Sequence, residues 1–163
     1  MLIKLKNKDT LIVDDFVFKC CVGKNELKKN KIEGDKSTPK GIFSLGKLYY
    51  RSDRVNKPET KLKIKNIKKK MGWSIDSKNK NYNSEIIVNK KIKHEKLFRR
   101  DYKYNYFIVI NYNTKNKISN KGSAIFIHLT KNYKPTAGCL ALKKNDFLIL
   151  AKILDKKNKI KIN

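Results

Sequence analysis

Two residues in the C-terminal part of the chain, Cys139 and His128, carry the side chains that nucleophilic catalysis needs. A free thiol has a pKa of about 8.5, so only a small fraction is thiolate at neutral pH. A nearby imidazole can take the proton and then stabilise the thiolate. Gly138 has no Cβ and lets a substrate approach the backbone, where the N–H groups of Gly138 and Cys139 are candidates for binding an oxyanion. This combination predicts attack on a carbonyl, a thioester intermediate, and transfer of the acyl group to an amine or to water.

The same residues also fit a purely structural interpretation. A cysteine after a glycine is more often a small buried residue, and a histidine at a strand end is more often a satisfied core or surface group. Cys20 and Cys21 fit that interpretation, because Cys20 shares a strand face with Phe16 and Phe18. Adjacent cysteines rarely bridge each other, and the spacing of cysteines and histidines matches no zinc site. We therefore expect neither a disulfide nor a bound metal.

The hydrophobic pattern predicts a mainly β fold with one main helix after the catalytic turn. Strands are expected in residues 2–6, 10–22, 42–50, 104–112, 123–129 and 159–162, and the first two form a hairpin. The helix is predicted from Asn145 onward, because apolar residues recur there at helical spacing, namely Phe147, Leu150, Ala151 and Leu154. A long ordered loop is expected in 23–40, irregular structure in 51–84, and a polar helical turn in 94–100. We find no repeat and no domain boundary, so one domain is expected over residues 1–163.

The strand expected over residues 123–129 fixes the direction of His128. Ala124, Phe126 and His128 alternate onto one face of this strand, and the intervening residues face the other way. A turn-rich segment, 132–138, then leads to Cys139. The candidate active site is therefore predicted where this strand meets the Gly138–Cys139 turn.

Several segments, in the same order along the chain, resemble the L,D-transpeptidase (YkuD-type) family. The family signature runs from a histidine through a short loop to Ser/Thr-x-Gly-Cys. Here it is Ser123-Ala-Ile-Phe-Ile-His128, followed by Pro135-Thr-Ala-Gly-Cys139-Leu-Ala-Leu142. Upstream, Glu33-Gly-Asp-Lys-Ser-Thr-Pro-Lys-Gly-Ile-Phe43 is similar to the family's Glu-Gly-Asp-x-x-Thr-Pro-x-Gly-x-Phe. One compact branch of the family is further resembled by Met71-Gly-Trp73, Asn81-Tyr-Asn83 and His94-Glu-Lys-Leu-Phe-Arg99. The resemblance spans residues 10–155.

The resemblance implies a mixed β-sandwich or barrel and a role for each motif residue. Cys139 is the implied nucleophile and His128 the general base. Gly138 and the Cys139 N–H form the oxyanion-binding turn, where Thr136 replaces the serine of many members and keeps the hydroxyl. The implied donor is a peptidoglycan stem tetrapeptide, whose third residue is attacked at its carbonyl while D-alanine leaves. An amine acceptor gives an L,D-transpeptidase and water gives an L,D-carboxypeptidase; no cofactor or metal is implied.

One position departs from the family pattern. Most members have an arginine two residues after the cysteine, where this chain has Ala141. The compact branch has Gly-Cys-Val-Ala-Leu at this point, so Ala141 is consistent with a subfamily. His94 is a candidate replacement that faces the active site, or else it anchors its loop through a hydrogen bond. Arg99 is a candidate for bidentate binding of a stem carboxylate, and a solvated surface side chain is its simpler alternative.

Three aromatic residues are weaker candidates for contact with the peptide substrate. Trp73 and Tyr82 either line the cleft or cover a small core beneath the long loop, and for Trp73 we favour the core. Tyr133 lies between His128 and Cys139 in the sequence and is a candidate for the border of the cleft.

The chain is strongly basic, with 41 Lys and Arg against 14 Asp and Glu and a formal net charge of +27. The excess is lysine spread along the sequence with abundant Asn and Ile, a composition that A/T-rich codons alone produce. A solvated lysine surface is therefore the favoured interpretation. The arginine forks and stacked aromatics of nucleic-acid readers are scarce, so no specific nucleic acid is expected. Anionic wall polymers are candidate partners, and a non-catalytic basic module is the rival to an enzyme.

Location and assembly rest on weaker signals. No run approaches the ~18 apolar residues needed to cross a bilayer. The alternating N-terminal residues lack the apolar core of a secretory signal, although the family implies action on the periplasmic or cell-wall side. We expect a monomer whose partners are peptidoglycan stem peptides.

Overall fold

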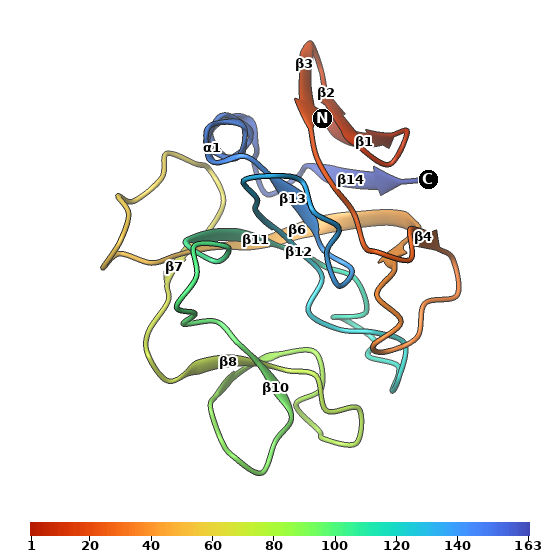
Figure 1. Ribbon diagram of the computed structural model, residues 1–163, viewed down its shortest axis with the longest axis vertical. Helices are drawn as coiled ribbons and strands as arrows, with labels where there is room; N and C mark the ends of the chain where they lie inside the picture. The colour runs from red at the N-terminus through yellow and green to blue at the C-terminus, as the bar shows by residue number, and fades with distance from the viewer.

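The structure is a computed structural model that describes residues 1–163. Its strands are β1 (Leu2–Lys6), β2 (Thr10–Val13), β3 (Phe16–Lys19), β4 (Leu27–Lys28), β5 (Thr38–Pro39), β6 (Gly41–Tyr50), β7 (Ile64–Asn66), β8 (Met71–Ser74), β9 (Glu85–Ile87), β10 (His94–Lys96), β11 (Tyr106–Ile110), β12 (Phe126–Leu129), β13 (Leu140–Leu142) and β14 (Lys159–Ile162). A nine-stranded sheet has the order β13-β12-β11-β6-β14-β1-β2-β3, with β7 paired to β6 (Figure 1). A small sheet, β10-β8-β9, and the short pair β4-β5 complete the strands.

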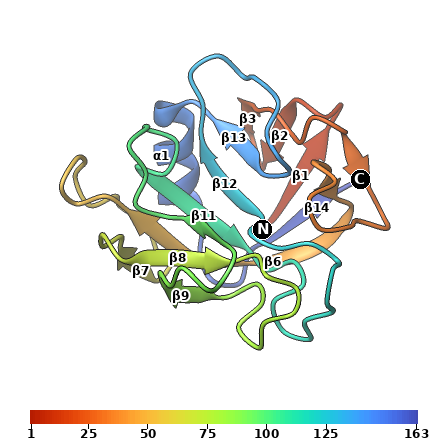
Figure 2. The same ribbon diagram turned by 60° about the horizontal axis from the view of Figure 1, so that its bottom comes forward.

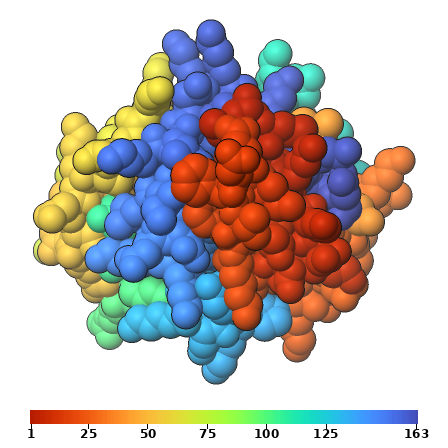
Figure 3. All heavy atoms as spheres, turned by 90° about the horizontal axis from the view of Figure 1, so that it is seen from above, coloured from red at the N-terminus to blue at the C-terminus, as the bar shows by residue number.

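A backbone bridge closes the large sheet into a barrel-like shape. Just beyond the end of β3, Cys21 forms an antiparallel bridge with Ala141 of β13, and both of its N–H···O distances are 3.0 Å. The line along which the two ends of the sheet meet, the seam, continues at Thr136, whose N–H donates to the Val22 carbonyl at 2.9 Å. The two ends of the strand order therefore meet beside the turn that carries Cys139. The chain ends also pair, since β1 runs parallel to β14, and their segments lie against each other in the space-filling view (Figure 3).

The large sheet is buried on both faces in its centre. In β11, Tyr106, Ile108 and Ile110 point into the core enclosed by the barrel. Phe107 and Val109 point the other way, into an aromatic cluster beneath the small sheet. Figure 2 shows that small sheet, with β8 and β9 labelled, lying alongside β11 and β6. Central strands buried on both faces have near-continuous apolar runs, which explains why β11 is so strongly predicted.

The predicted helix and the alternation around His128 are confirmed. α1 (Lys144–Ile153) buries Phe147, Leu150 and Ala151 against the barrel core. Phe126 belongs to the aromatic cluster, whereas its neighbours Ile125 and Ile127 belong to the barrel core, as the period of two requires. No helix in the structure has the length and apolar character needed to cross a membrane. The expected mainly β architecture with one helix after the catalytic turn is therefore correct.

The single strand predicted over residues 10–22 is wrong. The chain reverses at Asp14, whose φ is 48°, so that β2 and β3 form a hairpin of their own. Aspartate tolerates this left-handed conformation and favours turns. Phe16 is consequently 44% exposed on an edge strand, while Phe18 and Cys20 are buried.

Other elements also differ from the prediction, among them the strands β7 and β8 within residues 51–84, which were expected to be irregular. Residues 94–100 contain the strand β10 instead of a helical turn, because β8 offers an unpaired edge and His94 pairs with Ser74. The strand before His128 begins only at Phe126, because Ala124 has a φ of 53° and cannot continue an extended chain. β13 was not predicted, since three residues are too few to show a period.

Candidate active site

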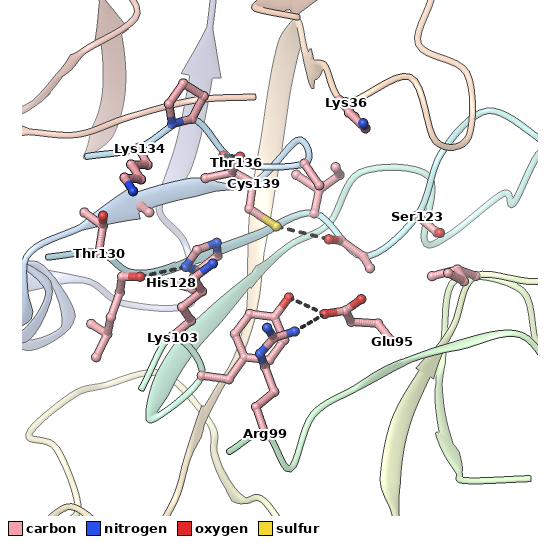
Figure 4. A pocket seen from close by; sticks show the side chains of 18 of the residues that line it. Lys36, Glu95, Arg99, Lys103, Ser123, His128, Thr130, Lys134, Thr136 and Cys139 are labelled. Carbon is pink, nitrogen blue, oxygen red and sulfur yellow. Dashed lines mark hydrogen bonds and ion pairs between the residues drawn. The ribbon is translucent and has the colours of Figure 1, made fainter. Parts of the chain in front are cut away.

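The parallel pairing of β12 and β13 brings Cys139 and His128 to one face of the sheet. Ile127 pairs with Leu140 and His128 with Ala141. Cys139 lies two residues before Ala141, so its side chain and that of His128 project to the same side. Figure 4 shows both side chains pointing into one pocket from neighbouring segments. The two residues singled out from the sequence are therefore brought together by strand register.

The pocket in front of them is a cavity of about 660 Å³. The segment before β12, the Gly138–Cys139 turn, the loop over residues 31–36 and the small sheet all contribute to its lining. His128 and Cys139 both line the cavity. Ala141, which forms the backbone bridge with Cys21, lines it as well. The cavity thus lies where the His128 strand meets the cysteine turn, which is the place predicted for the site.

The Cys139 thiol is held by two backbone groups. The Phe126 N–H donates to Sγ at 3.3 Å, and Sγ donates to the Ala124 carbonyl, also at 3.3 Å. Burial raises the pKa of the Cys139 thiol to about 12, against the effect of the Phe126 N–H. Cys139 therefore rests as a neutral thiol whose proton points at a carbonyl.

One ring nitrogen of His128 is held by the backbone, which leaves the other unprotonated. Its Nδ1 lies 3.0 Å from the Leu129 carbonyl, and because a carbonyl only accepts, Nδ1 carries the proton. The other ring nitrogen, Nε2, is left with a lone pair. Burial lowers the pKa of His128 to about 4, and the charge of Lys103 acts in the same direction. The ring also packs edge-on against Tyr104 at 5.5 Å between centroids, which fixes its plane.

The turn before Cys139 is organised by Thr136. Its Oγ1 accepts the Gly138 N–H at 3.0 Å and donates to the Cys139 carbonyl at 2.5 Å. A Cβ on Gly138, which has a φ of 138°, would come 2.8 Å from the Ser37 carbonyl oxygen. The Gly138 N–H is thus already used, whereas the Cys139 N–H donates to no group of the protein. Of the two donors expected from the sequence, only the Cys139 N–H is free to bind an oxyanion.

The Glu33-Gly34-Asp35 segment ties the loop over residues 31–38 to the site. Glu33 Oε2 accepts hydrogen bonds from the Tyr82 hydroxyl at 2.5 Å and from Ser123 Oγ at 2.6 Å. Ser123 precedes Ala124, so this carboxylate anchors the segment that faces the Cys139 thiol. The motif signals this anchoring role, but its partners 49 and 90 residues away could not be named from the sequence.

Asp35 shapes the same loop from within. It pairs with the buried Lys31 at 2.6 Å and accepts the N–H groups of Ile32 and Ser37. Burial alone would raise the pKa of Asp35, but the Ile32 N–H and the Lys31 ammonium hold it well below its usual range. The loop is therefore closed by a buried ion pair next to the cavity.

Arg99 and His94 occupy different surroundings. Arg99 lines the cavity, but Glu95 and Asp101 bind its guanidinium at 2.9 and 2.6 Å. With its side chain 30% exposed, Arg99 is neither a fully solvated arginine nor a free ligand group, because both carboxylates already bind its guanidinium. His94 does not line the cavity; its Nδ1 lies 2.7 Å from the Ile92 carbonyl, the loop-anchoring contact.

The three aromatic candidates also lie outside the cavity lining. Trp73 is buried in the aromatic cluster, and its Nε1 donates to Asn83 Oδ1 at 2.9 Å. Tyr82 is buried and holds Glu33 through its hydroxyl. Tyr133 packs beneath Lys19, whose ammonium lies 4.9 Å from its ring centre. None of the three contacts the cavity in this structure.

Lys103 is a cavity residue that sequence reasoning missed. It lies in the segment before β11, and its carbonyl accepts the Leu129 N–H at 3.0 Å, which places it beside the end of β12. Its ammonium forms no ion pair and lies close to the His128 ring in Figure 4. No sequence signal separates it from the other lysines, because only the fold brings residue 103 to residue 128. No group of side chains suited to a metal gathers in the protein.

Comparisons with known proteins agree with the mainly β fold. The family profile of the L,D-transpeptidase catalytic domain (YkuD) matches residues 3–162. Among solved structures, the helical cell shape determining protein Pgp2 from Campylobacter jejuni is similar, with a TM-score of 0.54 and 19% identity. The alignment covers 99% of this chain and 46% of that one, so this chain spans about half its length. A search of curated protein sequences gave no match. With its profile matched from end to end, the chain belongs to the L,D-transpeptidase catalytic domain (YkuD) family.

Proposed function

We propose that the protein is a peptidoglycan L,D-transpeptidase that works through a thioester on Cys139. One observation carries this proposal. His128 in β12 and Cys139 just before the paired strand β13 project into the same cavity, next to a Cys139 N–H that has no acceptor in the protein. Membership of the family supports peptidoglycan as the material acted upon, since the family is typically associated with the cell wall.

The proposed reaction starts from a neutral pair. As Sγ attacks the carbonyl of the third stem residue, its proton passes to His128 Nε2, and the Cys139 N–H binds the oxyanion that forms. When the tetrahedral intermediate collapses, the bond to D-alanine breaks and the imidazolium protonates the leaving amine. The thioester is then attacked by an acceptor amine, which gives a proton to His128, and the thiol is restored. Both protons thus pass through one nitrogen.

Hydrolysis of the same thioester is a second candidate, favoured by Ala141. This residue pairs with His128 across the sheet and has no side chain beyond Cβ. A water molecule beside the imidazole therefore meets less obstruction there than beside an arginine. With water as acceptor the enzyme is an L,D-carboxypeptidase.

We further propose that the site works on the periplasmic or cell-wall side, where the stem peptides are. Exposed lysines are suited to hold the protein near anionic wall polymers. The unpaired ammonium of Lys103 is suited to bind a carboxylate of the stem beside His128.

Incubation with purified disaccharide tetrapeptide tests the proposal, with mass spectrometry as the readout. Release of D-alanine with a cross-linked dimer indicates transpeptidation, and release with tripeptide alone indicates hydrolysis. Cys139→Ala should abolish both products, whereas the matched variant Cys20→Ala should retain them, because Cys20 is a free buried cysteine outside the cavity. Turnover that survives in Cys139→Ala would show the assignment of the nucleophile to be wrong. No turnover by the wild type, combined with salt-sensitive binding of wall polymers, would favour a non-catalytic module.

A further inference from the structure

Asn83 is a buried polar residue that the proposed reaction does not use, although it contacts Ala124, whose carbonyl accepts the Cys139 thiol. It is 3% exposed and lies in the loop between β8 and β9, two residues before β9 begins. Its Oδ1 accepts the Trp73 Nε1–H at 2.9 Å and the Ala124 N–H at 3.0 Å. Its Nδ2 donates to the carbonyls of Tyr112 and Asn113 at 2.9 and 2.8 Å. The whole hydrogen-bonding capacity of the amide is therefore used in one place.

Ala124 is where this clamp meets the active site. Its φ of 53° is in the left-handed region, which is disfavoured for a residue with a Cβ. Residues in such conformations persist when their surroundings over-determine them, and they gather at functional sites. The N–H of Ala124 is held by Asn83, and its carbonyl accepts the Cys139 thiol at 3.3 Å.

From this we infer that Asn83 is a positioning residue for the nucleophile: by holding Ala124 left-handed, it aims the Ala124 carbonyl at Cys139 Sγ. The carbonyl and the Phe126 N–H then hold the sulfur between them. Asn83 itself touches neither the thiol nor the cavity. The consequence for chemistry is a single resting position of the sulfur, next to His128 and the free Cys139 N–H.

Two opposite changes follow from removing the clamp. A misplacement of the attacking atom by about 1 Å costs about 100-fold in rate, so Asn83→Ala should lower kcat/KM by about that factor. Alkylation of Cys139 by iodoacetamide at pH 8 should become at least about tenfold faster, because a carbonyl that no longer faces the sulfur no longer favours the thiol over the thiolate. The first readout rests on the proposed function; the second does not need it.

The other cysteines serve as internal controls for folding. Cys20 and Cys21 are free and buried, and neither contacts Ala124. Alkylation resolved by peptide mass spectrometry should therefore accelerate at Cys139 alone. As a matched control, Asn158→Ala removes an equally buried asparagine that caps a turn at Asp155 far from the cavity. It should change neither Cys139 alkylation nor turnover.

Substitutions at Ala124 test the same link at the second of its two residues. Glycine adopts a φ of 53° freely, so Asn83→Ala combined with Ala124→Gly should recover about fivefold of the lost kcat/KM and slow Cys139 alkylation again. Ala124→Val should reproduce the behaviour of Asn83→Ala, because a β-branched residue resists this conformation. If Asn83→Ala does not fold, the Gly and Val variants at position 124 carry the comparison.

The possible results distinguish a failure of the positioning role from a failure of the proposed function. Unchanged Cys139 alkylation in Asn83→Ala, or Cys20 alkylated in step with Cys139, would overturn the positioning role. So would a double variant no better than Asn83→Ala, or Ala124→Val indistinguishable from Ala124→Gly. If wild-type protein turns over no muropeptide but alkylation responds as described, the proposed function fails and the positioning role stands.

Discussion

The two walls of the cavity are built in opposite ways. The anchored wall consists of Glu33, Ser123 and Ala124, with Asn83 behind them, and each of its polar side chains has a partner within the protein. The open wall consists of Lys103 and Lys134, whose ammonium groups have none. A site of this kind fixes the nucleophile before the substrate arrives and leaves charge on the other side for the substrate to satisfy. Substitutions in the anchored wall and in the reacting pair should therefore change the reaction rate and the stability. Substitutions in the open wall should change the affinity for the substrate.

The largest effect is expected at the reacting pair itself. His128→Asn keeps a donor for the Leu129 carbonyl but removes the base, so turnover should fall about 10³-fold, within the range for general-base catalysis. D-alanine release measures the change, and the thermal unfolding curve checks that the variant folds. Turnover within tenfold of wild type would mean that another group takes the thiol proton.

The low pKa of His128 also makes stability depend on pH. Burial lowers the pKa of this group from 6.5 to about 4, so below pH 6.5 the unfolded chain binds a proton that the folded protein does not. Stability is therefore complete above pH 6.5 and falls by about 3 kcal/mol as the pH drops to 4. Urea unfolding at several pH values, in wild type and His128→Asn, isolates this contribution. The contribution of Asp35 belongs to a more acidic window, because its pKa is lowered, and it should be common to both proteins.

A similar loss of stability is expected where the anchored wall loses its carboxylate. Glu33→Ala leaves the Tyr82 and Ser123 hydroxyls without their acceptor, which should lower the free energy of unfolding by about 2–3 kcal/mol. Glu59→Ala is the control, because its ion pair with Lys152 is fully exposed and should contribute nothing measurable. Equal effects of the two substitutions would contradict the anchoring role of Glu33.

The smallest effect is expected on the open wall. Lys103→Gln should raise KM about fivefold and leave kcat within about twofold, as expected for losing one exposed charge contact of about 1 kcal/mol. The effect should shrink at high salt. Lys47→Gln, an exposed lysine away from the cavity, should change neither constant. A loss confined to kcat would place Lys103 with the reacting groups instead.

How much of the structure can be predicted from the sequence depends on how far apart along the chain the contacting residues lie. The alternation through Phe126 and His128 and the helical spacing after Asn145 are local patterns, and both are found in the structure. The turn at Asp14 and the left-handed Ala124 interrupt strands that a period of two continues, because a single φ value has no hydrophobic signature. These two positions account for the misplaced limits of the strands predicted over residues 10–22 and 123–129.

The residues of the candidate site also divide into those that the sequence could indicate and those that only the fold brings together. Cys139 and His128 were singled out by residue type and by resemblance, and strand register places them together. Asn83 and Lys103 were not named for the site, because the contact of Asn83 with Ala124 spans 41 residues and that of Lys103 with β12 depends on the fold. Arg99 was named, but its pairing with Glu95 and Asp101 could not be foreseen, since both carboxylates are neighbours whose orientation only the strand β10 determines.

The central claim, that Cys139 is an acyl-accepting nucleophile, is tested most directly by covalent trapping with a carbapenem. Intact-protein mass spectrometry should show one adduct with the mass of the added β-lactam, and peptide mapping should place it on Cys139. The adduct should be absent from Cys139→Ala and form much more slowly in His128→Asn. An unmodified wild type, or an adduct on Cys20 or Cys21 that persists in Cys139→Ala, would contradict the account.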